Sequence, residues 1–119
     1  MAKTLDFNKL HRPVLPLVMC DEAKTVIKVT TPSEALIEEL QETLPELEVV
    51  MSGEDEDAVD CCYTLAAQLV SCNLAGLDVT AEELRTVYWP KDKIINNLYL
   101  VTFYDAYASF ISEIHNAKN

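Results

Sequence analysis

The 119-residue sequence contains little glycine and no long apolar run. Its two glycines, Gly53 and Gly76, leave no material for a glycine-rich phosphate-binding loop. No apolar stretch reaches the roughly 18 to 20 residues that a membrane-spanning helix needs. The amino terminus, Met1-Ala2-Lys3-Thr4, lacks the apolar core and the small-residue cleavage site of a secretory signal. We therefore expect a protein of the cell interior that makes no contact with membranes.

Side chains for catalysis or metal binding are scarce and poorly spaced. The only histidines, His11 and His115, lie at opposite ends of the chain, which argues against a nucleophile–base pair. Cys61 and Cys62 are adjacent and therefore point in different directions on a helix, and no Cys-x-x-Cys motif occurs. We predict no enzymatic activity, catalytic residue, metal site or cofactor, and interpret the cysteines as small core residues.

Lys and Arg are absent from residues 33–57, which hold ten Asp and Glu side chains. Residues 1–32 carry a net charge of +2, this acidic segment −10 and residues 58–119 −3, which accounts for the total of −11. Such a surface repels nucleic acid and anionic membranes, and it favours solubility or a basic protein partner. We interpret the segment as a solvated face, with mimicry of nucleic acid toward a basic partner as the alternative.

The length and the 50% apolar composition predict one domain, residues 1–119, with a single core. Two runs of strand length, 14–20 and 25–30, flank a polar turn and predict a β-hairpin over residues 14–31. Pro16 cannot donate a hydrogen bond to a neighbouring strand, so the first strand should lie at an edge.

Residues 32–115 are predicted to form a helical part that includes the acidic segment. Thr31, Pro32 and Glu34 indicate a helix start with Thr31 as the cap, and Pro45 should end that helix. Residues 46–53 are predicted to be a loop or a short strand. The fold class is therefore α+β, a short amino-terminal β-hairpin followed by a bundle of about four α-helices.

Three further helices are indicated. Residues 54–73 have a narrow polar stripe, so this helix should be covered on most sides and lie at the centre. Thr80 and Glu83 form a capping box that begins a short helix reaching about Trp89. The last and longest helix should run from Lys91 to about His115.

The last helix holds five of the nine aromatic residues. An apolar stripe that includes Phe103, Tyr107 and Phe110 predicts a core face. Tyr99 and Tyr104 fall off that stripe, and partly exposed tyrosine is typical of protein interfaces. We take this helix as the candidate partner-binding surface, with the residues Tyr99, Phe103, Tyr104, Tyr107 and Phe110.

The order of these signals resembles a known family. A short hairpin ending at Thr31-Pro32-Ser33 precedes a first helix, and a later helix ends in Leu65-Ala66-Ala67-Gln68-Leu69-Val70-Ser71-Cys72-Asn73, with Gly76 shortly after. Val79-Thr80-Ala81-Glu82-Glu83-Leu84 and the closing aromatic helix follow. Over most of residues 14–114 the chain resembles the small tail assembly chaperones of long-tailed bacteriophages and prophages. Its signals are patterns of common residues.

The resemblance implies a non-enzymatic α+β protein of the host bacterial cytoplasm. It implies binding to the tape-measure protein, whose long apolar helices the chaperone keeps soluble, and recruitment of the major tail protein. It carries no catalytic residues over to this sequence. Homo-oligomerisation stays open, and no nucleic acid partner is expected. The alternative function is a small acidic inhibitor that occupies the nucleic-acid groove of a basic protein.

Overall fold

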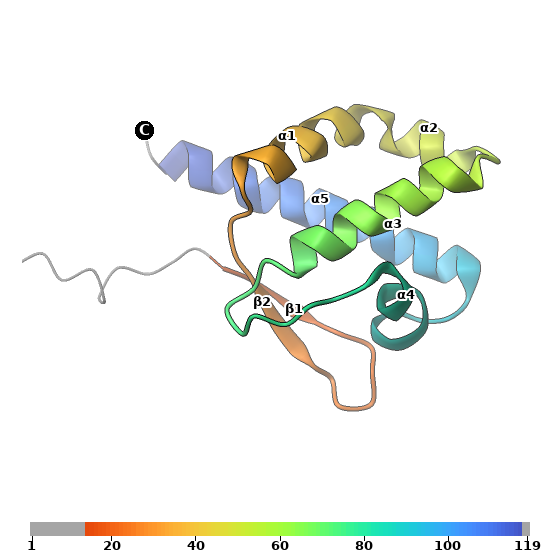
Figure 1. Ribbon diagram of the computed structural model, residues 1–119, viewed down its shortest axis with the longest axis horizontal. Coiled ribbons are helices and arrows are strands. Elements are labelled where there is room, and N and C mark those ends of the chain that lie inside the picture. The colour runs from red at the N-terminus through yellow and green to blue at the C-terminus, as the bar shows by residue number, and fades with distance from the viewer. Residues whose placement is uncertain (1–13, 118–119) are drawn as a thin grey trace, which may run out of the picture.

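The computed structural model describes residues 14–117, and side chains as far as Ile114. His11 therefore lies outside the described residues, as does the side chain of His115. An antiparallel hairpin precedes a set of helices, which confirms the α+β class and the predicted order of hairpin and helical bundle (Figure 1). Within the described residues, no helix is both long enough and apolar enough to cross a membrane.

The hairpin consists of β1 (Leu15–Val18) and β2 (Val26–Val29), with Leu17 opposite Ile27 and Val18 opposite Val26. Opposed residues of an antiparallel pair point to the same face. Ile27 and Val29 are therefore buried on the inner face, whereas Val18 and Val26 lie on the outer face, both exposed. The predicted hairpin is confirmed in position and in direction.

The two edges of the hairpin differ. The edge of β2 that faces away from β1 is hydrogen-bonded to the segment after α3. Thr30 N–H donates to Cys72 O (2.7 Å), and Leu74 N–H donates to Lys28 O (3.1 Å). Within residues 14–117 the sheet has two strands and β1 is paired with β2 alone, so the exposed Pro16 lies in an edge strand, as predicted.

The cap of helix α1 (Glu34–Thr43) lies two residues later than predicted. Ser33 is extended and its hydroxyl accepts a hydrogen bond from Leu36 N–H (3.4 Å), so Ser33, not Thr31, is the N-cap. Pro32 consequently precedes the cap. The cap prediction was wrong because two hydroxyl residues flank Pro32 and either matches the sequence pattern.

Helix α1 ends at Thr43, just before Pro45, as predicted, but helical structure continues in new elements. Pro45 lies in a 3-10 turn, Leu44–Glu46, and α2 (Leu47–Ser52) follows directly. Backbone N–H groups in the first turn of a helix have no acceptor within the helix. Pro45, which lacks an N–H, is therefore tolerated at this position. The predicted loop or strand at residues 46–53 is wrong. The three-residue spacing of Leu47 and Val50 instead turns both side chains toward the core.

The central helix is α3 (Glu56–Val70), as predicted. Asp55 caps it, and seven of its fifteen residues are buried. A capping box of Thr80 and Glu83 begins α4 (Ala81–Glu83), also as predicted, and a π-helical segment (Leu84–Tyr88) continues it. The last helix, α5 (Lys93–Ala117), is the longest.

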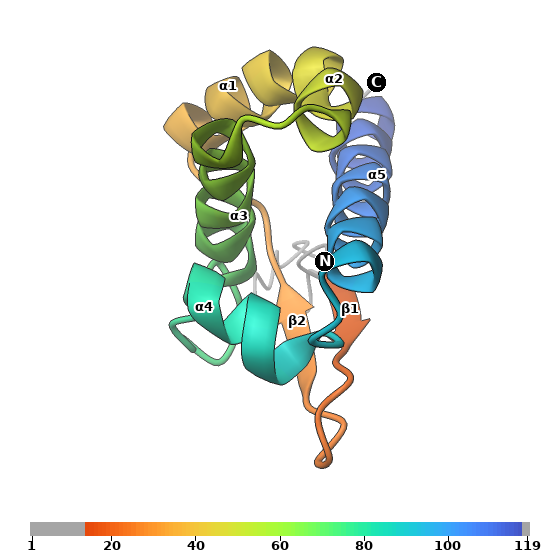
Figure 2. The same ribbon diagram turned by 90° about the vertical axis from the view of Figure 1, so that its right-hand side faces the viewer.

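Helices α3 and α5 cross each other (Figure 1), lie on opposite sides of the core (Figure 2) and are in contact. The pair α1 and α2 closes one side of the space between them, and the hairpin with α4 closes the other (Figure 2). One cluster of buried side chains draws on both strands' inner face, on α1, α2 and α3, and on α5. This arrangement leaves one long face of α5 turned to solvent.

Candidate functional site

Four of the five predicted partner-binding residues lie in the core. The exposed fraction is 5% for Phe103, 0% for Tyr104 and Tyr107, and 8% for Phe110, whereas Tyr99 is 37% exposed. The prediction that Phe103, Tyr104, Tyr107 and Phe110 form an exposed binding surface is therefore corrected. Only Tyr99 is accessible to a partner of the folded protein.

Contacts from both neighbouring elements account for this burial. The rings of Phe103 and Tyr107 lie 5.5 Å apart between centroids, and Tyr107 and Phe110 lie 5.9 Å apart. Tyr104 donates a hydrogen bond to Cys62 O of α3 (2.6 Å), and Tyr107 donates to Thr30 O after the hairpin (3.3 Å). Because α3 and the hairpin both cover α5, its buried face is wider than one apolar stripe predicts.

The apolar surface of α5 is formed instead by its first two turns. The exposed fraction is 81% for Ile94, 43% for Ile95, 61% for Leu98 and 37% for Tyr99. Residues four apart lie on the same side of a helix, so Ile94 adjoins Leu98 and Ile95 adjoins Tyr99. These four residues form one continuous patch, which we call the outer face of α5.

Local sequence fixes where the outer face begins. Asp92 accepts hydrogen bonds from Ile94 N–H (3.0 Å) and Ile95 N–H (3.2 Å) through Oδ1, so it caps α5. This cap sets the rotation of the helix, with Asn96 and Leu100 turned inward and buried. Sequence reasoning missed Ile94, Ile95 and Leu98 because it followed only the strongest stripe. The second pattern, 94/98 and 95/99, was present beside it.

The exposed hairpin end borders this surface on one side. The nearby Cys20 side chain, just after β1, raises the pKa of Tyr99, which places the two residues close together. On the outer face of the hairpin, Val18 is 66% exposed and Val26 is 53% exposed. Apolar side chains that are accessible to solvent therefore occur on both elements.

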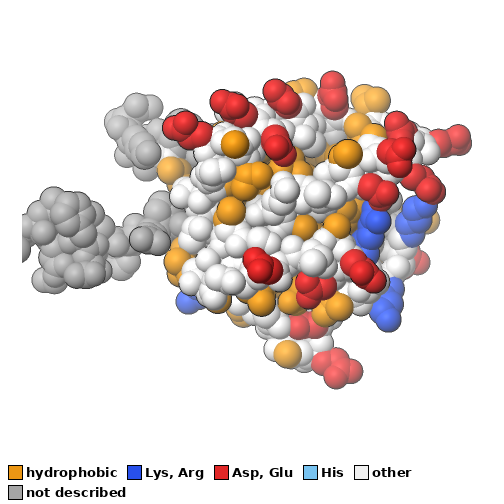
Figure 3. Space-filling model, in the orientation of Figure 1, with side chains coloured by type: hydrophobic (Ala, Val, Ile, Leu, Met, Phe, Trp, Pro, Cys, Tyr) orange, Lys and Arg blue, Asp and Glu red, His pale blue; other side chains and the backbone are white. Residues whose placement is uncertain are grey.

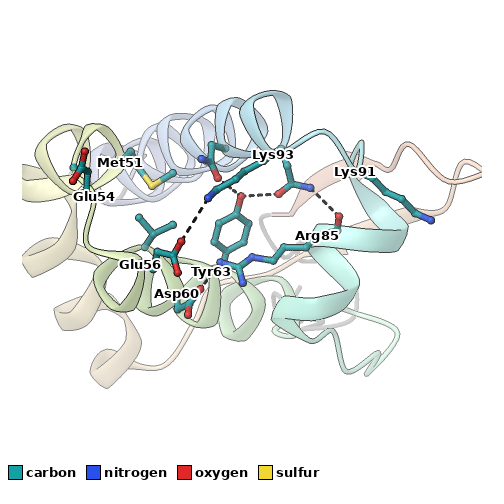
Figure 4. A pocket seen from close by; sticks show the side chains of 12 residues that line it. Met51, Glu54, Glu56, Asp60, Tyr63, Arg85, Lys91 and Lys93 are labelled. Carbon is teal, nitrogen blue, oxygen red and sulfur yellow. Dashed lines mark hydrogen bonds and ion pairs between the residues drawn. The ribbon is translucent and has the colours of Figure 1, made fainter.

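A pocket of about 600 Å³ lies on the inner side of the same two turns (Figure 4). Its walls come from the turn after α2, the start of α3, the π-helical segment and α5. Oppositely charged side chains converge there. The residues Glu54, Glu56, Asp60, Arg85, Lys91 and Lys93 supply the charges.

Most of this charge is already paired within the protein. Arg85 lies 2.6 Å from Asp60 Oδ1 and its guanidinium stacks 4.0 Å above the centre of the Tyr63 ring. Lys93 lies 3.8 Å from Glu56, and both side chains are at least 80% exposed, so this pair contributes little to stability. Lys91 points away from Tyr63 (Figure 4). The pocket therefore offers no strong net charge to a ligand.

The floor of the pocket is a buried polar network. The Tyr63 hydroxyl lies 2.7 Å from Asn96 Oδ1 and 2.6 Å from Asn97 Oδ1. Asn96 is 3% exposed, and its amide nitrogen lies within 3.3 Å of the carbonyl oxygens of Leu84, Arg85 and Pro90. The network ties α3, the π-helical segment and α5 together, so its evident role is structural.

Burial also determines the protonation state of Tyr63. Loss of solvent raises the pKa of Tyr63, and the nearby Arg85 guanidinium opposes that rise. The hydroxyl is therefore neutral near pH 7. A neutral phenol donates its single proton to one acceptor, and the fixed Asn96 amide presents Oδ1 to it.

The described residues contain no group of three or more His, Cys, Asp or Glu side chains that could hold a metal ion. Cys61 is exposed and Cys62 is buried, in agreement with their predicted divergence. The interpretation of the cysteines as core residues is corrected for Cys20 and Cys61, which are both exposed. Burial raises the pKa of Cys62, and the adjacent Cys61 adds to that rise, so the thiol form is favoured. A neutral buried thiol is a poor nucleophile.

The acidic segment covers α1, α2 and the start of α3. Its side chains line the upper edge formed by α1 and α2 and continue to the right-hand end, where Lys and Arg side chains lie beside them (Figure 3). Glu34, Glu38, Glu39 and Glu42 are all exposed. This placement agrees with a solvated face, and it also leaves the carboxylates free to meet a basic partner.

Comparison with known proteins gives no relative by sequence or by structure: no protein-family model, no curated protein and no solved structure matches this chain.

Proposed function

We propose that this protein is a non-catalytic tail assembly chaperone that binds an apolar helical segment of a tape-measure protein on the outer face of α5. The observation that carries this proposal is the continuous exposure of Ile94, Ile95, Leu98 and Tyr99. Contiguous exposed apolar side chains mark interaction surfaces more often than isolated ones do. We propose the tape-measure protein as the binding partner because the sequence resembles the chaperone family.

The outer face suits weak and repeated binding. Full burial of one aliphatic side chain stabilises a complex by about 1.5–3 kcal/mol before ordering costs are subtracted. Four side chains on two helical turns therefore give a small interface, and a single copy should bind only weakly. A tape-measure protein offers many apolar turns along its length, so several chaperone copies can cover it together.

The acidic segment supports the same role. It lies on α1 and α2, whereas the outer face lies on α5 (Figures 1 and 3). Like charges on neighbouring copies repel each other, which keeps a coated client soluble. On this proposal the protein acts in the host bacterial cytoplasm and brings the major tail protein to the coated client.

The test is co-expression with the tape-measure protein of the same genome. The native chain should increase the soluble fraction of that protein, and the double variant Ile94→Ser/Leu98→Ser should not. Val49→Ser is the matched control, because Val49 is 75% exposed but lies on α2. Equal effects of the native chain and the double variant, or no gain from the native chain, would contradict the proposal.

The acidic inhibitor is the second candidate, and the exposed carboxylates of α1 favour it. It requires binding that weakens steeply with added salt. It also requires large losses on charge reversal at Glu38, Glu39 and Glu42. Binding through the outer face should instead change little with salt and respond to Ile94 and Leu98.

A further inference from the structure

A second apolar surface lies at the opposite end of α5 from the outer face. A groove of about 460 Å³ separates the start of α1 from the end of α5. Both elements meet at the same end of the molecule (Figure 1). Three isoleucines supply its apolar lining, Ile37 from α1 and Ile111 and Ile114 from α5.

The three isoleucines are only partly covered. Ile111 and Ile114 pack with one side against the core and are half-buried. Ile37 is also half-buried, and it does not belong to the apolar side chains that pack against the core cluster. Branched apolar carbon therefore faces the groove from both helices.

The rim of the groove is acidic. Glu34 and Glu38 line it, and Glu42 continues the same row along α1. Residues four apart rise about 6 Å along a helix, so the row presents carboxylates at regular intervals. Like charges at this spacing repel each other, and a cation placed beside them relieves the repulsion.

Positive charge within the described residues lies elsewhere. The two ion pairs found there, Arg85–Asp60 and Lys93–Glu56, belong to the pocket at the other end of α5. Lys24 follows β1 in the turn of the hairpin, and Lys28 lies on β2. None of the described side chains that line the groove is basic.

We infer that this groove binds a basic amphipathic helix of another protein. Apolar side chains of that helix would lie on Ile37, Ile111 and Ile114, and its Lys or Arg side chains would pair with Glu34, Glu38 and Glu42. A helical partner is specified because lysines four residues apart repeat at the spacing of the glutamate row. This inference does not rest on the proposed function, since it uses a different surface and the opposite charge.

The probe is a synthetic helical peptide of Leu and Lys, with lysine repeated every fourth residue, and the matched peptide has Glu in place of Lys. Isoleucine methyl resonances of the full chain report where each peptide binds. The Leu–Lys peptide should shift the Ile37, Ile111 and Ile114 signals, and it can also shift those of Ile94 and Ile95, because the outer face of α5 is exposed apolar surface. The Leu–Glu peptide should leave the three groove signals in place, whatever it does at Ile94 and Ile95.

Two charge variants separate local pairing from general attraction. Glu34→Gln/Glu38→Gln should weaken binding of the Leu–Lys peptide about fivefold, because two exposed ion pairs are lost. Glu46→Gln/Glu48→Gln removes the same charge from exposed positions outside the groove and should change affinity less than about twofold. Equal losses in both variants, or shifts confined to Ile94 and Ile95, would overturn the inference.

A last experiment tests whether basic residues of the chain itself occupy the groove. In the absence of peptide, Lys9→Glu/Arg12→Glu should leave the three groove signals unchanged. If these signals move and the charge reversal strengthens binding of the Leu–Lys peptide, the groove belongs to the chain's own amino-terminal segment. That outcome also overturns an external partner.

Discussion

Helix α5 carries two sets of apolar side chains with opposite surroundings. The aromatic set, Phe103, Tyr104, Tyr107 and Phe110, is at most 8% exposed. The aliphatic residues of the outer face, Ile94, Ile95 and Leu98, are at least 43% exposed. The set that stands out in the sequence therefore builds the core, and the plainer set is the one that a partner can reach.

The difference follows from what each set contacts. Large rings fill the space between α3, α5 and the hairpin, and the tyrosine hydroxyls find backbone carbonyl partners at Cys62 and Thr30. Aromatic residues bury large areas, so a small domain gains most by placing them inside. The aliphatic residues lie beyond the reach of these neighbouring elements. Aromatic content alone is thus a poor guide to a binding surface.

Truncation in the aromatic set should give the largest effect. Phe103→Ala should reduce the free energy of unfolding by about 3–5 kcal/mol, because Phe103 contacts Tyr104 and Tyr107 in the core. Urea unfolding followed by circular dichroism measures the change. A loss below about 1 kcal/mol would show that Phe103 is not a core residue, and the comparison would fail.

The polar floor of the pocket should rank second. Asn96→Ala removes one of the two acceptors next to the Tyr63 hydroxyl and a donor to three carbonyl groups. Unsatisfied buried polar groups cost about 1–3 kcal/mol, so unfolding should become easier by that amount. Asn97→Ala removes only the other acceptor of the Tyr63 hydroxyl, from a half-buried position, and keeps the three carbonyl contacts of Asn96, so its loss should be smaller. Equal losses of unfolding free energy for the two variants would show that the hydrogen bonds of Asn96 do not hold the network together.

Alkaline pH should destabilise the fold through the buried tyrosines Tyr104 and Tyr107 in the same unfolding assay. Burial raises the pKa of Tyr104 and of Tyr107 well above the usual value near 10. Their neutral forms stabilise the fold fully below about pH 10, and this stability is lost as pH rises further. Each should remove about 1.4 kcal/mol per pH unit in that range. Tyr104→Phe and Tyr107→Phe should each reduce the loss of unfolding free energy with rising pH. If the slope of unfolding free energy against pH stays unchanged in both variants, this prediction is contradicted.

The capping box of α4 predicts a smaller effect. Thr80 accepts a hydrogen bond from Glu83 N–H (3.1 Å), and Glu83 accepts one from Thr80 N–H (3.1 Å). Thr80→Ala should lower the free energy of unfolding by about 1 kcal/mol. Thr86→Ala, on an exposed position of the following π-helical segment, should change it less. The reverse order would contradict the cap.

Substitution on the outer face should change stability least. Ile94→Ser removes a side chain that is 81% exposed, so the free energy of unfolding should stay within about 0.5 kcal/mol of the native value. Chemical denaturation measures this directly. A loss as large as that of Phe103→Ala would place Ile94 in the core and remove the contrast between the two sets.

Local signals predicted much of the fold. The hairpin, the central position of α3 and the capping box of α4 depend on alternation, on a narrow polar stripe and on Thr80 with Glu83, all of which act within a few residues. Helix α2 was missed because Pro45 was read as a stop, whereas a proline at the beginning of a turn is permitted.

The candidate site was less predictable because it depends on distant contacts. Tyr104 is buried by α3, and its hydroxyl bonds to a residue 42 positions away. Arg85 meets Asp60 across 25 positions. Periodicity identifies the face of a helix that is most apolar, but it does not state how wide a face the neighbouring elements cover. Tyr99 was the one predicted site residue that this coverage left exposed.

The most direct test of the account compares binding of the tape-measure protein by two variants in one titration. Ile94→Ser/Leu98→Ser alters the exposed set, and Tyr104→Phe alters the buried set without creating a large cavity. The account predicts that the first variant weakens binding at least about tenfold and that the second binds like the native chain. Loss of binding in Tyr104→Phe, with native affinity in the outer-face variant, would contradict it.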